Sequence, residues 1–230
     1  MKSKLYAAVA ALALAGPALA AQSKPTVAVI PYTNSAIGKA NEELAPLSKG
    51  IADLMTGELM ANSGIRLVER DQLNAALKEQ DLSAGGRVDA ATAVKVGKLL
   101  GAKHVVVGTF VTDRSNNMVL TSRVFNTETS EIEFATSDRD KTDNFMALVT
   151  KVAHKLNAGM KLPDIPKQTS EAHLKTAEKM PFQAVLLYSR AIAAEDSGNK
   201  QEAIELYRAT LAKFPGHDLS EAAVKRLQGK

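Results

Sequence analysis

The densest charged group beside an apolar run is Glu69-Arg70-Asp71. Two carboxylates and a guanidinium in such a position could serve as an acid–base pair, in which one group donates a proton and another accepts it. The structural alternative makes Asp71 the N-cap of a helix and leaves Glu69 and Arg70 as solvated or paired charges, which are common and chemically inert. The spacing favours this structural interpretation.

The glycine-containing segment Ser83–Arg87 (SAGGR) is a second candidate, because backbone N–H groups in such a loop can form a nest that binds an anion or a nucleotide phosphate. A phosphate-binding loop, however, requires the pattern GxxxxGK[ST] directly after a strand. Neither the pattern nor the placement occurs here. We therefore interpret the segment as a connector.

The sequence also has no motif for metal binding or for nucleophilic catalysis. The histidines His104, His154, His173 and His217 are scattered, and no HExxH or His–carboxylate pair has the spacing of metal ligands. The nucleophile pattern GxSxG is absent. The sequence thus predicts a protein that is not an enzyme, with no catalytic residue, no metal site and no cofactor.

Strands and helices alternate in the first half of the chain. Continuous β-branched runs predict buried strands, and apolar residues at helical spacing predict helices. The predicted strands are 26–30, 65–68 and 104–111. A helix over Leu47–Leu59 lies between the first two, with Ser63-Gly64 as its stop and residues 32–43 as a loop before it. Two short helices, capped by Asp71 and Asp89, lie between the second strand and the third.

After residue 111 the periodicity changes to two, as in strands with one buried face. Turn signals at Asn116-Asn117 and Glu128–Ser130 separate these strands, which predicts a meander of three antiparallel strands. Apolar residues from Phe145 to Leu156 predict a closing helix. The predicted fold class is α/β: a two-layer or three-layer sandwich with a mixed sheet, over residues 25–160.

The polar segment 161–168 (KLPDIPKQ) holds two prolines and is the predicted linker. Residues 169–230 are predicted to be all-α. Pro181–Lys213 reads as two antiparallel helices joined at Ser197-Gly198-Asn199. Helices are also expected at both flanks, Ser170–Lys179 and Asp218–Leu227.

Residues 1–21 have the three parts of a secretory signal peptide. Two lysines precede the apolar run Ala7–Ala15, and Ala18-Leu19-Ala20 is a small-x-small cleavage site. The apolar run is shorter than the roughly 20 residues of a membrane span. We expect cleavage after Ala20 or Ala21 and a mature protein in the periplasm, where it can associate with the outer membrane.

Cysteine is absent, which excludes both a disulfide framework and the lipid anchor that bacterial lipoproteins carry on an N-terminal cysteine. Removing the signal peptide takes away two lysines and no acid, so the formal net charge falls from +4 to +2. This excess is too small to indicate nucleic-acid binding, which depends on clustered Lys and Arg. We therefore expect no nucleic-acid partner, no membrane span and no lipid anchor.

The segments VAVIPY, RLVERDQL, LSAGG and GKLLGAKHVVVGTF occur in this order from Val27 to Phe110. Their order and spacing resemble the curli production assembly/transport family of outer-membrane secretion proteins, from Thr26 to about Leu156. The same core fold occurs in the N-terminal domain of the Tol–Pal β-propeller protein, in flagellar periplasmic accessory proteins and in lipoprotein activators of cell-wall synthases. The resemblance implies binding and assembly in the cell envelope without catalysis, as an analogy of fold.

This chain differs from the curli channel in a way that argues against a membrane pore. The curli channel resembles this core with two added hairpins that build a membrane barrel, whose strands need about 9–11 residues each. Between Thr112 and Lys141 this chain has room only for the two strands of the core sheet. We expect a pore-less periplasmic relative.

The C-terminal unit resembles a single tetratricopeptide repeat. Counted from Ala184, the matching residues are Ala191 at position 8, Gly198 at 15, Ala203 at 20, Tyr207 at 24 and Pro215 at 32. Such repeats bind peptides through four positions of their first helix, which here correspond to Val185, Tyr188, Ile192 and Glu195. Because one repeat is too short an array to be stable alone, the alternative is that this face packs on flanking helices, on the α/β domain or on a second copy.

Two functions fit these features. The first is a non-enzymatic periplasmic protein that acts in assembly, secretion or maintenance of a cell-envelope complex through contacts with cell-envelope or secretion proteins. The alternative is a self-assembling, ring-type subunit of an outer-membrane secretion apparatus, and thus a homo-oligomer.

Overall fold

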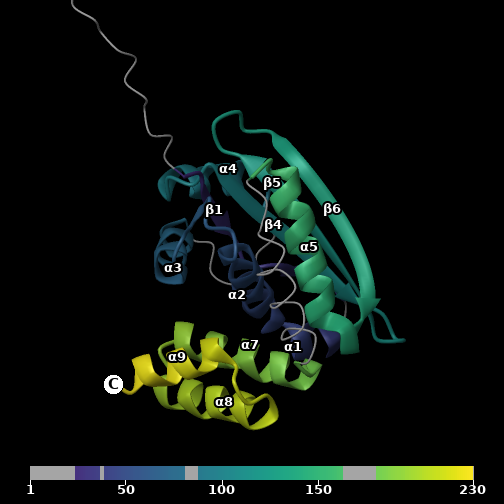
Figure 1. Ribbon diagram of the computed structural model, residues 1–230, viewed down its shortest axis with the longest axis vertical. Coiled ribbons are helices and arrows are strands. Elements are labelled where there is room, and N and C mark those ends of the chain that lie inside the picture. Colours follow the sequence, from purple (N-terminus) through teal and green to yellow (C-terminus); the bar gives the residue numbers. More distant parts are fainter. Residues whose placement is uncertain (1–23, 37–38, 81–87, 163–179, 230) are drawn as a thin grey trace, which may run out of the picture.

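The computed structural model describes residues 24–36, 39–80, 88–162 and 180–229 (Figure 1). The predicted signal peptide, the loop Ser83–Arg87, most of the predicted linker and the helix predicted at 170–179 lie outside these residues. The elements are β1 (Thr26–Val29), β2 (Thr33–Asn34), α1 (Lys39–Leu44), α2 (Leu47–Met60), β3 (Arg66–Leu67), α3 (Arg70–Glu79), α4 (Ala90–Leu99), β4 (His104–Thr112), β5 (Asn117–Asn126), β6 (Ile132–Lys141), a short 3-10 helix (Thr142–Asn144), α5 (Phe145–Gly159), α7 (Phe182–Asp196), α8 (Lys200–Lys213) and α9 (Asp218–Leu227).

One mixed sheet forms the centre of the α/β domain, as predicted. Its strand order is β3-β1-β4-β5-β6, with β2 paired to β4 beyond the end of β1. β1 is parallel to both of its neighbours, β3 and β4. The β4-β5-β6 part is the predicted antiparallel meander.

The sheet is covered unequally on its two faces. Helices α2 and α5 pack on one face along its length, around residues such as Val106, Leu120 and Val124 (Figure 1). Helices α3 and α4 pack on the other face at its parallel end, where Phe125 is the β5 residue in their core. The domain therefore has three layers at one end and two at the other, and among the described residues no helix core extends over this second face of β6.

The three C-terminal helices pack against α2 as one body with the α/β domain. The core of α2 and α5 continues into α7 and α8 in one cluster of buried residues, including Ala184 and Ala203. Helices α2 and α7 come very close together at Gly50, where an added Cβ would lie 1.8 Å from the Ser189 Oγ. Glycine is therefore required there by the packing of the helices.

Two local predictions are wrong. Asp71 is not the N-cap of α3, because the helix begins at Arg70 and Glu69 occupies the cap position without a side-chain cap bond. The loop predicted at 32–43 contains β2 and most of α1. Helix α2, by contrast, agrees with the predicted helix to within one residue, and the turn after it is closed by the Gly64 N–H, which donates to the Asn62 side-chain oxygen at 2.8 Å. The predicted cap at Asp89 is confirmed, since its carboxylate accepts the Thr92 N–H.

Candidate functional site between the sheet and the C-terminal helices

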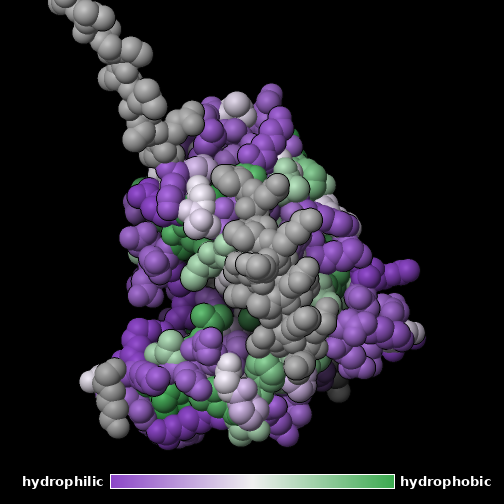
Figure 2. Space-filling model, in the orientation of Figure 1, coloured by the Kyte–Doolittle hydropathy of each residue, from purple (hydrophilic) through white to green (hydrophobic). Residues whose placement is uncertain are grey.

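A cleft of about 210 Å³ lies where α2, the start of α3 and the end of α7 meet. We call it the junction cleft. Its walls are Lys49, Asp53 and Met60 from α2, residues 67–70 from β3 and the start of α3, Asp196 from α7 and Leu219 from α9. The space-filling view shows the recess between the α/β domain and the C-terminal helices, with hydrophobic residues beside it (Figure 2).

Arg70 connects the two units across this cleft. Its guanidinium forms an ion pair with Glu195 at 2.7 Å and approaches Asp196 at 3.7 Å. Glu195 also pairs with Arg226 of α9 at 2.5 Å and accepts a hydrogen bond from the Tyr207 hydroxyl at 2.7 Å. Burial alone would raise the pKa of Glu195, but these three donors outweigh it and hold the pKa at about 2. The carboxylate is therefore ionised and fully engaged.

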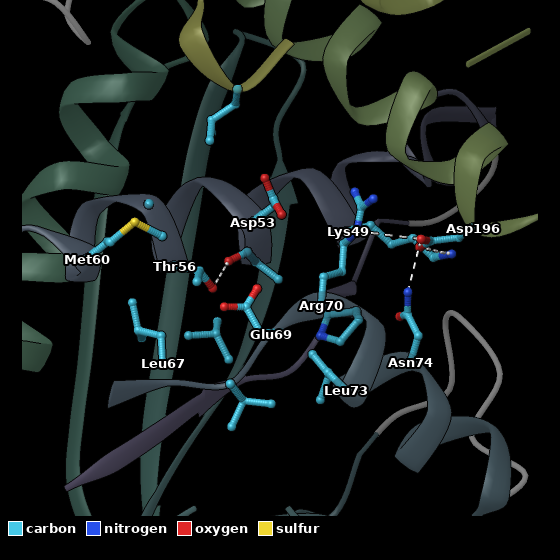
Figure 3. Close-up of a pocket in the computed structure, with 16 residues that line it drawn as sticks. Lys49, Asp53, Thr56, Met60, Leu67, Glu69, Arg70, Leu73, Asn74 and Asp196 are labelled. Carbon is cyan, nitrogen blue, oxygen red and sulfur yellow. Dashed lines mark hydrogen bonds and ion pairs between the residues drawn. The ribbon is translucent and has the colours of Figure 1, made fainter. Parts of the chain in front are cut away.

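Asp196 is engaged in the same way at one end of the cleft. Lys49 forms an ion pair with it at 2.7 Å, and the Asn74 side-chain amide donates to it at 3.0 Å. Figure 3 shows Lys49, Asn74 and Asp196 converging there, while Met60 and Leu67 lie at the opposite end. Charged groups from α2, α3 and α7 thus bind one another and hold the helices together.

A buried pair, Asp53 and Tyr188, lies beside this network. The Tyr188 hydroxyl donates a hydrogen bond to Asp53. Burial raises the pKa of Asp53, against the lowering effect of Tyr188 and Arg70. Burial and the neighbouring Asp53 raise the pKa of Tyr188 as well. The ring of Tyr188 also packs edge-on against His217 at 4.7 Å between ring centroids.

The four residues predicted to bind a peptide face the inside of the protein. Val185, Tyr188 and Ile192 are buried in the core shared with α2. Glu195 is engaged in the ion-pair network around Arg70. In this structure the α/β domain and α9 occupy the helix face that the repeat resemblance assigns to a peptide.

Two apolar side chains on the edge of the junction cleft are open to solvent. Met60 is 63% exposed and Leu219 is 38% exposed, which is unusual for large hydrophobic residues. Glu69, which lines the same cleft, is also exposed, and no hydrogen bond or ion pair joins its carboxylate to another described residue. The outer part of the cleft therefore presents apolar surface and one free negative charge.

The predictions about metals and membranes can be compared only with the described part of the chain. There, no group of three or more His, Asp or Glu side chains is placed to hold a metal ion. None of the helices in the same residues has the length and apolar character needed to span a membrane.

Residues 9–118 match a family model, that of the curli production assembly/transport component CsgG. The match extends from before β1 into β5 and includes Glu69, Arg70 and the α2 side of the junction cleft. It confirms the resemblance predicted from the sequence over this part of the chain. The resemblance of the C-terminal helices to a tetratricopeptide repeat stays a prediction. A comparison with curated protein sequences found no match.

Several solved structures are similar to this chain at low identity. The C-terminal domain of LpoB from Salmonella enterica is 17% identical, with 51% of this chain and 83% of that chain covered and a TM-score of 0.37. TolB from Acinetobacter baumannii is 10% identical, with 60% of this chain and 28% of the TolB chain covered and a TM-score of 0.37. PelC from Paraburkholderia phytofirmans, a dodecamer, is 10% identical, with 60% of this chain and 89% of the PelC chain covered and a TM-score of 0.36.

Proposed function

We propose that this protein is a non-enzymatic, periplasmic factor that acts in the assembly, secretion or maintenance of a cell-envelope complex by binding other proteins. The observation that carries this proposal is the match of residues 9–118 to the curli production assembly/transport component. The signal-peptide pattern of residues 1–21 supports export to the periplasm.

The junction cleft supports protein binding over catalysis. Most of its charged groups are engaged within the protein: Arg70 is paired with Glu195, Lys49 with Asp196, and Asp53 accepts a hydrogen bond from the Tyr188 hydroxyl. Glu69, which is exposed, is the exception. A general acid or base needs a group that is free to exchange a proton with substrate, and the buried groups of the cleft have structural partners, which leaves the solvated Glu69 without a second group to act with. The exposed Met60 and Leu219 are instead suited to receive an apolar side chain of a partner protein.

A site-directed crosslinking experiment tests this function. A photo-reactive amino acid is placed at Met60 and, as a matched control, at Leu99, which is 48% exposed at the end of α4 away from the cleft. In intact cells we expect one discrete adduct with an envelope protein from position 60 and none from position 99. The variant Met60→Asp should abolish co-purification of that protein, whereas Leu99→Asp should not. Identical adducts from both positions, or no adduct from position 60, would count against the proposal.

Self-assembly is a second candidate because of strand β6. This strand, Ile132–Lys141, pairs with β5 on one side, and among the described residues no strand lies on its other side. Ile132 on this edge strand is 52% exposed. A free edge strand can pair with a second copy. Light scattering of the mature protein decides between the candidates: a monomer at high concentration excludes the ring-type subunit, and a defined oligomer that Ile132→Asp dissociates supports it.

A further inference from the structure

The face of the sheet opposite α2 and α5, which α3 and α4 cover only in part, carries a row of hydroxyl groups that runs across four strands. In the strand register Thr33 of β2 is opposite Thr109 of β4, Thr109 is opposite Thr121 of β5, and Thr121 is opposite Ser137 of β6. Residues in register share a face of the sheet, and neighbouring strands are about 4.8 Å apart. The four hydroxyl groups therefore form a continuous polar line on the side opposite α2 and α5.

Part of this row lies in a second recess, which we call the sheet-face hollow. It has a volume of about 550 Å³ and lies between the start of α4 and strands β2, β4 and β5. Thr33, Ser35, Thr109 and Thr121 line it, together with Arg123. The Thr121 hydroxyl bonds to Ser137 at 2.9 Å, whereas no hydrogen bond joins the hydroxyls of Thr33, Ser35 or Thr109 to another described residue. The hollow thus offers unused donors and acceptors.

Arg123 is the cation in the lining of this hollow. It is exposed, and its cross-strand neighbours Val107 and Ala135 have no group that can pair with it. No ion pair joins Arg123 to a described residue. The two acids of β6 on either side of Ala135 have other partners. Glu133 contacts His104 and accepts a hydrogen bond from the Asn126 side-chain amide. Asp138 points to the other face, where it pairs with Lys151 and Lys155 of α5. The guanidinium is therefore free to bind an anion.

Asp89 is the acid in the lining, and its carboxylate has a partner at the start of α4. One of its oxygens accepts the Thr92 N–H at 2.8 Å, and these bonds at the start of α4 lower its pKa. The positive end of the helix dipole compensates a carboxylate in this position. The ionised Asp89 therefore has its partner on α4, and Arg123 is the charged group of the lining that has none among the described residues.

We propose that the sheet-face hollow binds a saccharide that carries a carboxylate. The hydroxyls of Thr33, Ser35 and Thr109 would exchange hydrogen bonds with the hydroxyls of the sugar, and the guanidinium of Arg123 would bind its carboxylate in a bidentate manner. The volume lies within the usual range for small-molecule sites, roughly 300–1,000 Å³. This site lies on the other face of the sheet from α2 and does not depend on the proposed protein-binding function.

The residues that line the hollow favour a saccharide over a peptide or a nucleic acid. A peptide segment would need a deep apolar pocket for an anchor side chain, and the largest apolar residues in the lining are Val88 and Val107. A single-stranded nucleic acid would need aromatic side chains for stacking and several cations, and the described lining has no aromatic residue and one arginine. A polyhydroxylated ring with one carboxylate matches the groups that are present.

Titrations of the mature protein with glucuronate and glucose, followed by amide NMR shifts, test the proposal. The two sugars differ in the carboxylate alone, and succinate serves as the anion without a sugar ring. We expect saturable binding of glucuronate, with the largest shifts at Thr33, Thr109 and Thr121. Binding of glucose or succinate should be about tenfold weaker, because each lacks one set of charged or polar contacts. Equal affinity for glucuronate and either control, or no saturable binding, would overturn the proposal.

Variants then test the assignment of residues. Arg123→Gln should weaken glucuronate binding about tenfold and leave the small affinity for glucose unchanged, because it removes only the charge contact. The matched control is Arg139→Gln, which alters an exposed arginine that is opposite Val119, outside the hollow. Thr109→Val should weaken the binding of both glucuronate and glucose, because it removes a hydroxyl that contacts the sugar ring. Equal losses in the two arginine variants, with unchanged melting temperatures, would show that general charge and not this site attracts the ligand.

Discussion

The junction cleft and the sheet-face hollow differ in what their polar groups do. In the cleft, Arg70, Glu195 and Asp196 bind one another at the contact of two helical layers. In the hollow, Arg123 and the hydroxyls of Thr33 and Thr109 have no partner among the described residues. Charge density alone is therefore a poor guide to function in this protein, since the most highly charged cluster is structural and the sparser one is free to bind a ligand.

The largest effect should come from filling the contact between α2 and α7. In Gly50→Val the new side chain would collide with Ser189, whose Oγ would lie 1.8 Å from the added Cβ. Overpacking of a buried contact costs about 2–3 kcal/mol, and urea unfolding should show a loss of this size. The matched control is Gly57→Ala on the same helix, where the nearest atom is Leu219 Cδ1 at 3.9 Å. This control should be neutral or stabilising by up to about 1 kcal/mol, because alanine is the better helix former. Equal losses in both variants would mean that α7 does not pack on α2 at Gly50.

A pair of arginine substitutions tests the contrast between the two regions directly. Arg70→Met keeps the aliphatic part of the side chain but leaves Glu195 and Asp196 with fewer donors, so we expect a loss of about 2 kcal/mol in the free energy of unfolding. Arg123→Met removes an arginine that has no ion pair with a described residue, and its effect should stay within about 0.5 kcal/mol. If Arg123→Met destabilised the fold as much as Arg70→Met, the hollow would be structural too.

The contrast also separates what local sequence pattern predicts from what it cannot. The meander β4-β5-β6 was predictable because the alternation around Leu120 and Val124 is a local property of the chain. The same alternation places Thr121 and Arg123 on the opposite face. The sequence also favoured a structural role for Arg70, as a solvated or paired charge, over an acid–base site.

The partners of Arg70 were not predictable. Glu195 and Asp196 lie far from it in the sequence, and they meet it only because α7 packs on α2. The absence of a side chain at Gly50 allows this packing against Ser189, and no local pattern marks either residue. For the same reason the face of Val185 and Ile192 resembled a peptide-binding surface, although it packs inside the protein. The hydroxyl row was hidden for a different reason: strand register brings Thr33 beside Thr109, and register is a property of the folded sheet.

Acid should lower the free energy of unfolding through groups beside the junction cleft and not through groups of the hollow. The loss should be smaller than those expected for the Gly50 and Arg70 substitutions. Burial lowers the pKa of His217, which packs on Tyr188, to about 4, compared with 6.5 in the unfolded chain. Between these values the unfolded chain binds a proton that the folded protein does not, so stability is lost as the pH falls from about 6.5 to about 4. Glu195 also makes the protein less stable as the pH falls, but at lower pH, because its pKa is about 2 in the folded protein and 4.5 ordinarily. Asp53 has the opposite effect, because its pKa is raised in the folded protein.

Melting temperatures measured from pH 7.5 to pH 4 in the wild type and in His217→Phe test this effect. The phenyl ring keeps the packing against Tyr188 but cannot titrate, so the variant should lose the slope between pH 6.5 and pH 4 even if it is less stable at every pH. The same slope in both proteins would mean that another group controls the acid response. The lining of the hollow has no histidine among the described residues, so its affinity for glucuronate should not follow this slope as long as the protein stays folded. An affinity that fell together with the melting temperature in the wild type but not in His217→Phe would show that the cleft and the hollow are coupled through the sheet.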